Sequence, residues 1–474
     1  MYNKGNIAKG CVFMPIKLSL IVPHPPLIIP EVGKGEQSKI QSTVDSYHKA
    51  ARLAASANPE TIVVISPHSV MYADYIHVSP GDSAKGHLGR FGAPGVSVAV
   101  KYDREFVDKL CKIAELENLP VGTLGQKDAS LDHGTFVPLY FIDQYMSDYR
   151  LVRISISGLS PLEHYRFGEC IARTADELGR NILVMASGDL SHKLAEDGPY
   201  GYAKEGPEFD SQVTKAMRNA DFMQFLQFTD EMTEAAAECG LRAFIIMAGA
   251  VDGKAVEPDF MSYEGPFGVG YAVCAYQTTG EDQSRRFAGR YEAQREEKIR
   301  QARQSEDEYV KLARMTLESY IKTGKELEMP AGLPEEMLKN RAGVFVSLKV
   351  DGRLRGCIGT LCPTAANIAR EIMQNAVSSG TGDPRFSPVT ERELVNVEYS
   401  VDVLSESEPI DSMEQLDAKR YGVIVTKGGR RGLLLPNLEG VDTPEQQVAI
   451  ALKKAGISSS EKYAMERFEV VRHR

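Results

Sequence analysis

The sequence predicts an α/β fold: an open, largely parallel or mixed sheet with flanking helices, followed by a separate α+β domain. Three observations lead to this prediction. Up to about Thr278, short apolar runs alternate with segments of helical periodicity, which is typical of βαβ units. The composition changes abruptly after Gln277, and hairpin and helix patterns mix beyond residue 305. A chain of 474 residues also exceeds one ordinary core, so two domains are expected.

The first domain is expected to span residues 1–278. A helix is predicted over residues 40–57, where Tyr47, Ala51 and Ala54 share one face with other apolar residues. The expected strands are short apolar runs: Leu18–Val22, Thr61–Ser66, Leu151–Ser157, Ile182–Ala186 and Val269–Tyr276.

A linker and a second domain are expected to follow. Residues 279–304 are dense in Arg, Glu, Gln and Asp, which is typical of a solvated, partly helical linker. Within residues 305–474, the dipeptide Asp351-Gly352 favours a two-residue hairpin turn between two apolar runs. Thr443, Pro444 and Gln446 form a capping-box pattern that starts a helix, and Gly456 suits its end.

Composition and charge exclude several classes of protein. A hydrophobic content of 43% and a formal charge of -10 describe a globular protein that repels nucleic acid. We expect no membrane span, because charged residues interrupt every apolar stretch before roughly 18 residues. The segment from Met1 to Leu20 is not expected to be a signal peptide. Seven cysteines without a Cys-x-x-Cys pair favour a reducing compartment, so a cytoplasmic location is expected.

Histidines are concentrated in the first domain, because eight of the nine lie within the first 192 residues. His24, His68 and His192 each follow a predicted strand by two to six residues. The carboxyl ends of parallel strands open on one crevice, so these three histidines are expected to converge there. Any one of them alone is more readily an ordinary surface or core residue. The other histidines of this domain outside the motifs below are expected to have ordinary solvated roles: His48, His77, His87 and His164.

Two imidazoles and one carboxylate make a mononuclear metal site that leaves coordination positions open, as non-haem Fe(II) oxygenases require. We expect Glu264 to supply the carboxylate, because it lies in a Gly/Pro-rich turn immediately before the last predicted strand of the domain. Gly265 and Gly268 would allow the backbone to approach the metal closely. Taken alone, Glu264 is a weak candidate, since acidic residues are abundant in loops.

Five motifs together resemble the class III extradiol ring-cleavage dioxygenases of the catalytic B-subunit type. Their order and spacing match across almost the whole first domain, and they are Val-Pro-His-Pro-Pro, Ser-Pro-His, Leu131 to Leu139, Gly188 to His192, and Tyr263 to Gly268. The related Memo proteins share this fold but are similar to a divergent branch in which the third metal ligand is cysteine. Because this chain has Glu264 in the corresponding motif, the dioxygenase pattern is favoured.

The resemblance implies a role for each matching residue. His24, His68 and Glu264 would bind iron, His192 would act as acid and base, and His133 would hydrogen-bond substrate or oxygen in the pocket. Asp189, three residues before His192, would orient that imidazole or cap the following helix, and both alternatives stay open.

In the second domain, the string Leu354-Arg-Gly-Cys-Ile-Gly-Thr360 and the segment Asp383-Pro-Arg-Phe386 resemble the AMMECR1 domain, over about residues 306–473. Cys357 raises the hypothesis of a nucleophile near Arg353 and Arg355. A buried structural cysteine is the favoured alternative, because the only histidine of this domain is His473. Three arginines are candidates for gathering an anionic ligand, with solvated surface charge as the alternative: Arg385, Arg430 and Arg431.

The expected function is that of an Fe(II)-dependent extradiol-type dioxygenase acting on a catechol-like or aminophenol-like aromatic, with dioxygen as co-substrate and an AMMECR1 accessory domain. Zinc and manganese are the alternative metals. A Memo-type metal-binding or partner-binding module is the alternative from another class, and a metal enzyme with different chemistry is a third. The resemblance also implies a radical-SAM protein as a partner. The sequence leaves the oligomeric state open, a homo-oligomer included.

Overall fold

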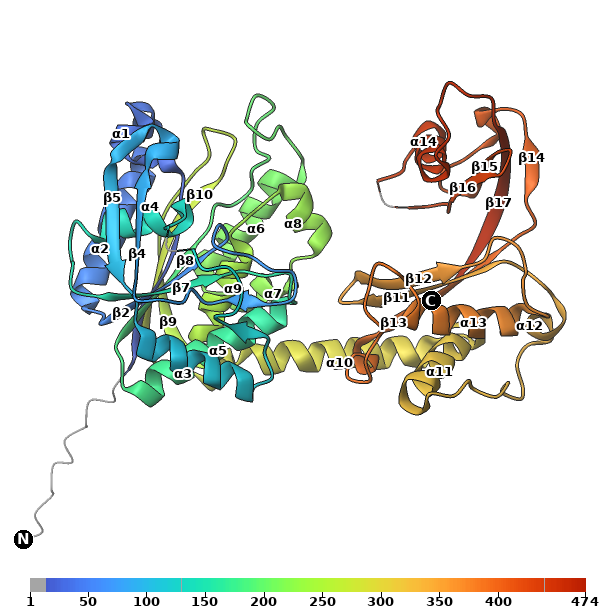
Figure 1. Cartoon of the computed structure of the whole chain (residues 1–474), viewed down its shortest axis with the longest axis horizontal. Helices are drawn as coiled ribbons and strands as arrows, with labels where there is room; N and C mark the ends of the chain where they lie inside the picture. The colour runs from blue at the N-terminus through green and yellow to red at the C-terminus, as the bar shows by residue number, and fades with distance from the viewer. Residues whose placement is uncertain (1–13, 129, 439) are drawn as a thin grey trace, which may run out of the picture. The chain divides into compact units, whose positions relative to one another are not determined.

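The computed structural model describes residues 14–128, 130–438 and 440–474 (Figure 1). The chain divides into two compact units, Met1–Ala293 and Gln294–Arg474, and the boundary lies within one helix of the segment expected to be a linker. Most of the segment considered as a signal peptide lies outside the described residues. No helix in the described ranges is both long enough and apolar enough to cross a membrane.

Unit 1 contains the predicted strands and further elements between them. Its strands are β1 (Ile16–Val22), β2 (Thr61–Ser66), β3 (Ile76–His77), β4 (Ser83–Leu88), β5 (Ala93–Lys101), β6 (Val121–Gly122), β7 (Arg150–Ser155), β8 (Ile182–Ser187), β9 (Lys254–Glu264) and β10 (Tyr271–Glu281). Its helices are α1 (Pro30–Gly33), α2 (Gln41–Ala57), α3 (Arg104–Leu116), α4 (His133–Ile142), α5 (Pro161–Leu178), α6 (Glu205–Asn219), α7 (Phe222–Gln227), α8 (Asp230–Ala236), α9 (Leu241–Ala250) and the start of α10 (Phe287–Ser305).

The main sheet of unit 1 is mixed, as predicted. Its strand order is β7-β2-β8-β1-β10-β9. The four strands from β7 to β1 run parallel, whereas β10 is antiparallel to both of its neighbours. The carboxyl ends of β1, β2 and β8 therefore lie next to one another at one edge of the sheet.

Helices cover both faces of this sheet, which explains why its central strands are rich in apolar residues. In β2, Ile62 and Val64 pack into the core shared with α2 and α4, while Val63 and Ile65 pack into the core shared with α5 and α9. Figure 1 shows these helix pairs on opposite sides of the strands. Every residue of β2 and β8 is buried, so the strand ends are held rigidly where ligands bind in such sheets.

Unit 2 is a separate α+β unit, as predicted. Its helices are the remainder of α10, α11 (Glu308–Thr323), α12 (Glu335–Lys339), α13 (Ile368–Thr381) and α14 (Pro444–Ala455). Its strands are β11 (Val344–Val350), β12 (Arg353–Gly359), β13 (Glu398–Leu404), β14 (Glu408–Ile410), β15 (Tyr421–Lys427), β16 (Arg430–Leu434) and β17 (Ala464–His473).

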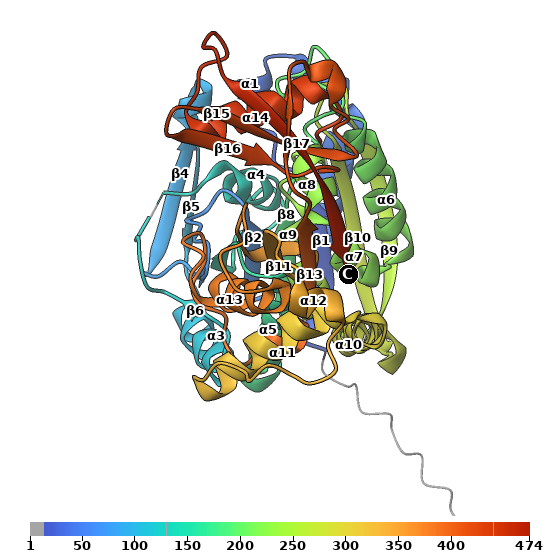
Figure 2. The same ribbon diagram turned by 90° about the vertical axis from the view of Figure 1, so that its right-hand side faces the viewer.

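The strands of unit 2 form one antiparallel sheet in the order β12-β11-β13-β17-β15-β16, with β14 paired to β17. Two larger cores and one small cluster of Leu404, Ile424 and Phe468 lie along it. One larger core joins α11 and α13 to β11 and β13, and the other joins α14 to β15 and β16 (Figure 2). Asp351 and Gly352 both have positive φ in the predicted hairpin turn between β11 and β12.

Candidate metal centre

Two of the predicted histidines meet at the edge where the parallel strands end. His24 lies two residues after β1, and His68 lies two residues after β2. Their Nε2 atoms are 3.0 Å apart, although β8 separates the two strands in the sheet. His24 is almost fully buried, whereas His68 is exposed. The two imidazoles therefore share one small volume at the mouth of the sheet.

The third group in this volume is a thiol that the sequence analysis did not select. His24, His68 and Cys239 each offer a ligand atom, and the three atoms lie within 4.8 Å of one another. The Sγ atom of Cys239 is 3.6 Å from Nε2 of His24. Among the described residues, no other group of three such side chains meets this criterion.

Cys239 reaches the site because two glycines allow close backbone packing. Cys239 directly precedes Gly240, after which α9 begins at Leu241. A Cβ atom on Gly188 would lie only 2.1 Å from the Cα atom of Gly240, so any side chain at that position would push the two loops apart. The backbone N–H of Asp189 donates to Sγ of Cys239 at 3.3 Å.

The structure corrects the assignment of Glu264 as the third ligand. Glu264 is the last residue of β9, and its carboxylate accepts hydrogen bonds from the N–H and the hydroxyl of Thr43 at 2.7 and 2.6 Å. These donors belong to the first turn of α2, whose N-cap residue makes no side-chain cap. The carboxylate thus satisfies a helix N-terminus.

The sheet order places Glu264 on the outer strand β9. The end of β9 lies on the same edge as the ends of β1 and β2, because β9 and β1 are both antiparallel to β10. However, β9 is two strands from β1 and four from β2. At about 4.8 Å per strand, its backbone lies roughly 10 Å beyond β1. The sequence analysis chose Glu264 for its turn before the last strand, and the order of the strands and the contact with Thr43 could not enter that choice.

A hydrogen-bond chain determines which nitrogen of His24 faces the site. The hydroxyl of Ser187 donates its proton to the carbonyl oxygen of Gly134 at 2.5 Å. Its oxygen, 2.9 Å from Nδ1 of His24, is therefore left to accept, so Nδ1 carries the imidazole proton. Nε2 then points its lone pair at His68 and Cys239, as a metal ligand requires.

Desolvation favours the neutral form of the histidines of the site. Desolvation, together with the neighbouring imidazoles, holds the pKa of His24 well below its usual value, and desolvation also lowers the pKa of His68. His133 stacks on His68 with ring centroids 4.1 Å apart, and burial with the nearby His68 lowers its pKa to about 4. Neutral imidazoles are the form that binds metal.

Asp189 and His192 complete the surroundings of the centre. Asp189 is buried, its carboxylate accepts from the N–H of His24 at 2.8 Å, and burial raises its pKa to about 7. A carboxylate oxygen also lies 3.9 Å from Nε2 of His24. His192 stacks on Tyr200 with centroids 5.0 Å apart, and burial with the nearby His68 lowers its pKa. Asp189 thus orients the His24 segment, a role that the sequence analysis did not consider.

The donor set fits a transition-metal ion. Ligands about 2.0 to 2.3 Å from one ion lie roughly 3 to 4 Å from each other, and the two measured separations, 3.0 and 3.6 Å, fall in this interval. The chemistry agrees as well, because imidazole and thiolate are preferred by zinc, copper and iron. Burial and the nearby Asp189 raise the pKa of Cys239 well above its usual value, so a cation is what would favour its thiolate.

Two other histidines differ from the sequence-based expectation. His77 and His164 are fully buried, whereas both were expected to be solvated. His164 lies in α5 and its ring contacts Ser157 and the carbonyl oxygen of Ser160. The pattern that could have identified Cys239 is a Cys-Gly pair directly before a strongly apolar helix, since helix N-termini favour thiolates.

In unit 2, the structure places Arg385 beside Cys357, with Nη2 donating to the carbonyl oxygen of Cys357 at 3.3 Å, whereas Arg430 and Arg431 lie on β16 at the other end of the sheet. Cys357 lies on β12, and the hydroxyl of Ser347 donates to its Sγ at 3.2 Å. Arg430 pairs with Glu461, and Arg431 with Glu466, so these two arginines belong to other ion pairs.

His473 does not serve as a base for Cys357. Its ring stacks on Tyr309 with centroids 3.9 Å apart, and its Nδ1 pairs with Asp307.

Comparisons with known proteins match both units. The family model for the catalytic LigB subunit of aromatic ring-opening dioxygenase matches residues 18–274, and the AMMECR1 model matches residues 310–473. A protein of Clostridium acetobutylicum is 42% identical over 463 residues, covering 96% of this chain and 98% of that protein. A Thermotoga maritima protein is 51% identical over 171 residues, covering 36% of this chain and 98% of its own length. A crystal structure from Pyrococcus horikoshii has 34% identity and a TM-score of 0.33, covering 35% of this chain and 88% of that one.

Proposed function

The chain belongs to the family of the catalytic LigB subunit of aromatic ring-opening dioxygenase and carries an AMMECR1 domain, and from this we propose that unit 1 is a metal-dependent enzyme of the Memo type. The observation that carries the proposal is the convergence of His24, His68 and Cys239 within 4.8 Å. A cysteine as third ligand is the feature that distinguishes the Memo branch from the dioxygenase pattern.

The donor set narrows the choice of metal. Zinc, copper and iron(II) suit two imidazoles and a thiolate, whereas manganese prefers oxygen ligands. Manganese was a reasonable alternative only while Glu264 was the expected ligand. When bound, the metal would supply Lewis acidity at its open coordination positions, where a small substrate would bind.

The residues around the centre supply proton transfer and positioning. Asp189 is suited to exchange a proton near neutral pH, because burial raises its pKa to about 7. His192 is held by stacking on Tyr200 and is neutral, so it can accept a proton from a bound hydroxyl or thiol group. His133 is neutral too and offers a hydrogen bond beside His68. Ser187 keeps the lone pair of His24 directed into the site.

A ring-opening dioxygenase is the second candidate, favoured by the family match over residues 18–274. It would use iron(II), dioxygen and a catechol-like or aminophenol-like aromatic. The thiolate in place of the carboxylate is the point at which this chain departs from the two-histidine, one-carboxylate pattern of such enzymes.

The test combines metal content with turnover. The full chain is purified anaerobically, loaded separately with Fe(II), Zn(II) and Cu(I), and analysed by mass spectrometry for bound metal. We expect one ion per chain in the wild type, almost none in His68→Ala, and one in His192→Ala. Oxygen uptake is then followed for each loaded form with catechols and aminophenols.

The outcomes separate the candidates. Oxygen uptake by the iron form with a stoichiometric ring-opened product would establish the dioxygenase and exclude our first choice. Tight metal binding without oxygen uptake is the result that we expect. Full metal retention in His68→Ala would contradict both the Memo-type enzyme and the ring-opening dioxygenase, because each needs His68 as a ligand.

A further inference from the structure

Unit 2 contains a cavity of about 590 Å³, which is within the range of small-molecule sites. Its wall is formed by β11, β12, β13 and β17 together with α10 and α11, and by residues from the side of α14. It therefore lies between the two cores of this unit. Cys357, the residue that drew attention in the sequence, lines it.

Positive charge in the wall of this cavity exceeds negative charge. Its basic residues are Arg303, Lys349, Arg385, Lys454, Arg472 and Arg474, and its acidic residues are Glu306, Glu398 and Asp402. Each of these acids already pairs with a basic side chain. In the described part of the chain, neither Lys349 nor Lys454 has an ion-pair partner. This excess is notable in a chain whose formal charge is -10.

Two arginines are fixed beside Cys357. Arg472 is held by Asp402 through its Nε and Nη2 atoms at 2.7 and 3.0 Å, and Arg385 is held in the same manner by Asp383 at 2.9 and 2.6 Å. Among the described residues, Nη1 of neither guanidinium has a hydrogen-bond partner. Nη2 of Arg385 also donates to the carbonyl oxygen of Cys357 at 3.3 Å, and Arg472 lines the same cavity as Cys357. An anionic group placed there would meet two oriented donors.

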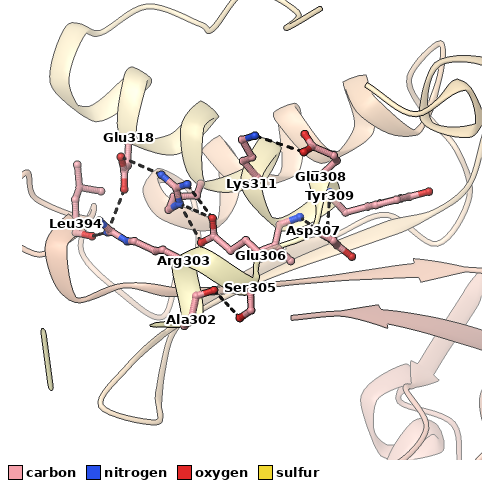
Figure 3. Close-up of polar contacts among 12 residues, drawn as sticks. Ala302, Arg303, Ser305, Glu306, Asp307, Glu308, Tyr309, Lys311, Glu318 and Leu394 are labelled. Atoms are coloured by element: carbon pink, nitrogen blue, oxygen red, sulfur yellow. Dashed lines mark hydrogen bonds and ion pairs between the residues drawn. The ribbon is translucent and has the colours of Figure 1, made fainter. Parts of the chain in front are cut away.

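A buried hydroxyl in the wall also lacks a partner. Tyr399 lines the cavity with only 7% of its surface exposed, and its hydroxyl has no hydrogen bond within the described ranges. Nearby, Arg303 donates through Nη2 to Glu318 and to the carbonyl oxygen of Leu394, as Figure 3 shows, but its buried Nε has no partner in that part of the chain. Unsatisfied buried donors of this kind call for an acceptor.

The remaining wall is apolar. Ile299, Val310, Leu354, Val397, Leu435 and Leu438 contribute aliphatic side chains. A bare inorganic ion would leave this surface in contact with water, whereas a molecule with an apolar body would cover it.

We propose that this cavity binds a small organic anion, with its carboxylate or phosphate group beside Arg385, Arg472 and Cys357 and its apolar body against the aliphatic wall. The site is independent of the metal centre of unit 1. Carboxylates and phosphate monoesters share the chemistry that these guanidinium groups recognise.

The first test uses Cys357 as a reporter in the full chain. The protein is alkylated with iodoacetate or with its neutral analogue iodoacetamide, and labelling is quantified by peptide mass spectrometry. Cys362, which is exposed, serves as the internal reference in the same unit. We compare the ratio of iodoacetate to iodoacetamide labelling at the two cysteines. At low salt, we expect this ratio to be roughly tenfold higher at Cys357 than at Cys362. This preference should fall sharply at about 1 M salt. An equal ratio at both cysteines would overturn the proposal.

The matched variants test the source of the preference. Lys454→Gln and Lys349→Gln remove exposed charges from the wall without unpairing a buried carboxylate, and together they should lower the iodoacetate preference about threefold. Lys453→Gln, a neighbouring exposed position outside the wall, should leave it unchanged. An equal effect of all three substitutions would assign the preference to overall charge and contradict the proposal.

The second test identifies the ligand chemistry by protection. Hexanoate and hexyl phosphate are compared with hexanol for their ability to slow iodoacetamide labelling of Cys357. Protection by either anion at concentrations where hexanol has no effect supports the site, and the stronger of the two identifies the preferred group. Equal protection by hexanol, or none by either anion, would refute it.

Discussion

The polar groups of the two units have shifted pKa values for different physical reasons. At the candidate metal centre of unit 1, burial dominates, because it lowers the pKa of His24 and raises the pKa values of Asp189 and Cys239. In unit 2, partners dominate, because hydrogen bonds from Arg385 hold the pKa of Asp383 far below its usual range. The first site thus lacks a positive charge and the second carries an excess of it. The difference teaches that a cation would complete one site and an anion the other.

Replacing the thiol ligand should have the largest effect on this contrast. Cys239→Ser removes the soft donor, so we expect metal affinity to fall by more than the 10–100-fold typical of changes outside the ligand set. Glu264→Gln, at the position that the sequence favoured, should retain one ion per chain. Competition with a chelator of known affinity measures the metal affinity of both variants. If Glu264→Gln lost the metal and Cys239→Ser kept it, the original assignment would be restored.

Removing the buried carboxylate should change how stability depends on pH. Asp189 has a folded pKa of about 7, above the unfolded value, so the folded protein binds the extra proton and loses stability as pH rises from about 4 to about 7. Metal-free Asp189→Asn lacks this titrating carboxyl group. The difference in free energy of unfolding between this variant and the wild type should therefore be about 2 to 4 kcal/mol more favourable to the variant at pH 8 than at pH 5. Peptide-resolved hydrogen exchange in urea measures the free energy of unfolding of unit 1 at each pH.

Metal provides the control for this effect. A bound cation favours the carboxylate, so the pH-dependent gain should shrink in the metal-loaded protein. A gain of the same size with and without metal would mean that Asp189 does not sense the centre.

Glu371 in unit 2 provides the opposite case, a buried acid satisfied by donors. Burial alone would raise its pKa, but hydrogen bonds from Thr360, Thr364 and Ala365 together lower it. Glu371→Gln turns one acceptor into a donor and should destabilise α13 by about 2 kcal/mol. Faster hydrogen exchange of α13 peptides at pH 7 would show this. Glu391→Gln, an exposed position, is the control, and equal exchange in both variants would contradict the assignment.

The smallest effect is expected from the hydroxyl that orients His24. Ser187→Ala removes the acceptor of the Nδ1 proton, so we expect metal affinity to fall about 10-fold. Ser19→Ala on β1 is the matched control, because the hydroxyl of Ser19 is buried without a partner in the described residues. Isothermal titration with Zn(II) compares the two, and indistinguishable affinities would remove Ser187 from the account.

Local pattern by itself determined much of this protein. Short runs rich in apolar residues identified β1, β2, β7 and β8, because both faces of these strands are covered. The placement of His24 and His68 just after two such runs identified the edge where they meet, since carboxyl ends of parallel strands share one side.

Only the tertiary structure brings the proposed third ligand to the two histidines. The direction of β10 and the position of β9 beyond it follow from pairing between distant segments, so the sequence could not show that Glu264 lies two strands from His24. Cys239 enters from a loop more than two hundred residues away in the chain, through the contact of Gly188 with Gly240. Sequence periodicity records which residues are buried, whereas the distance between two side chains depends on strand order and on close packing, which no local pattern contains.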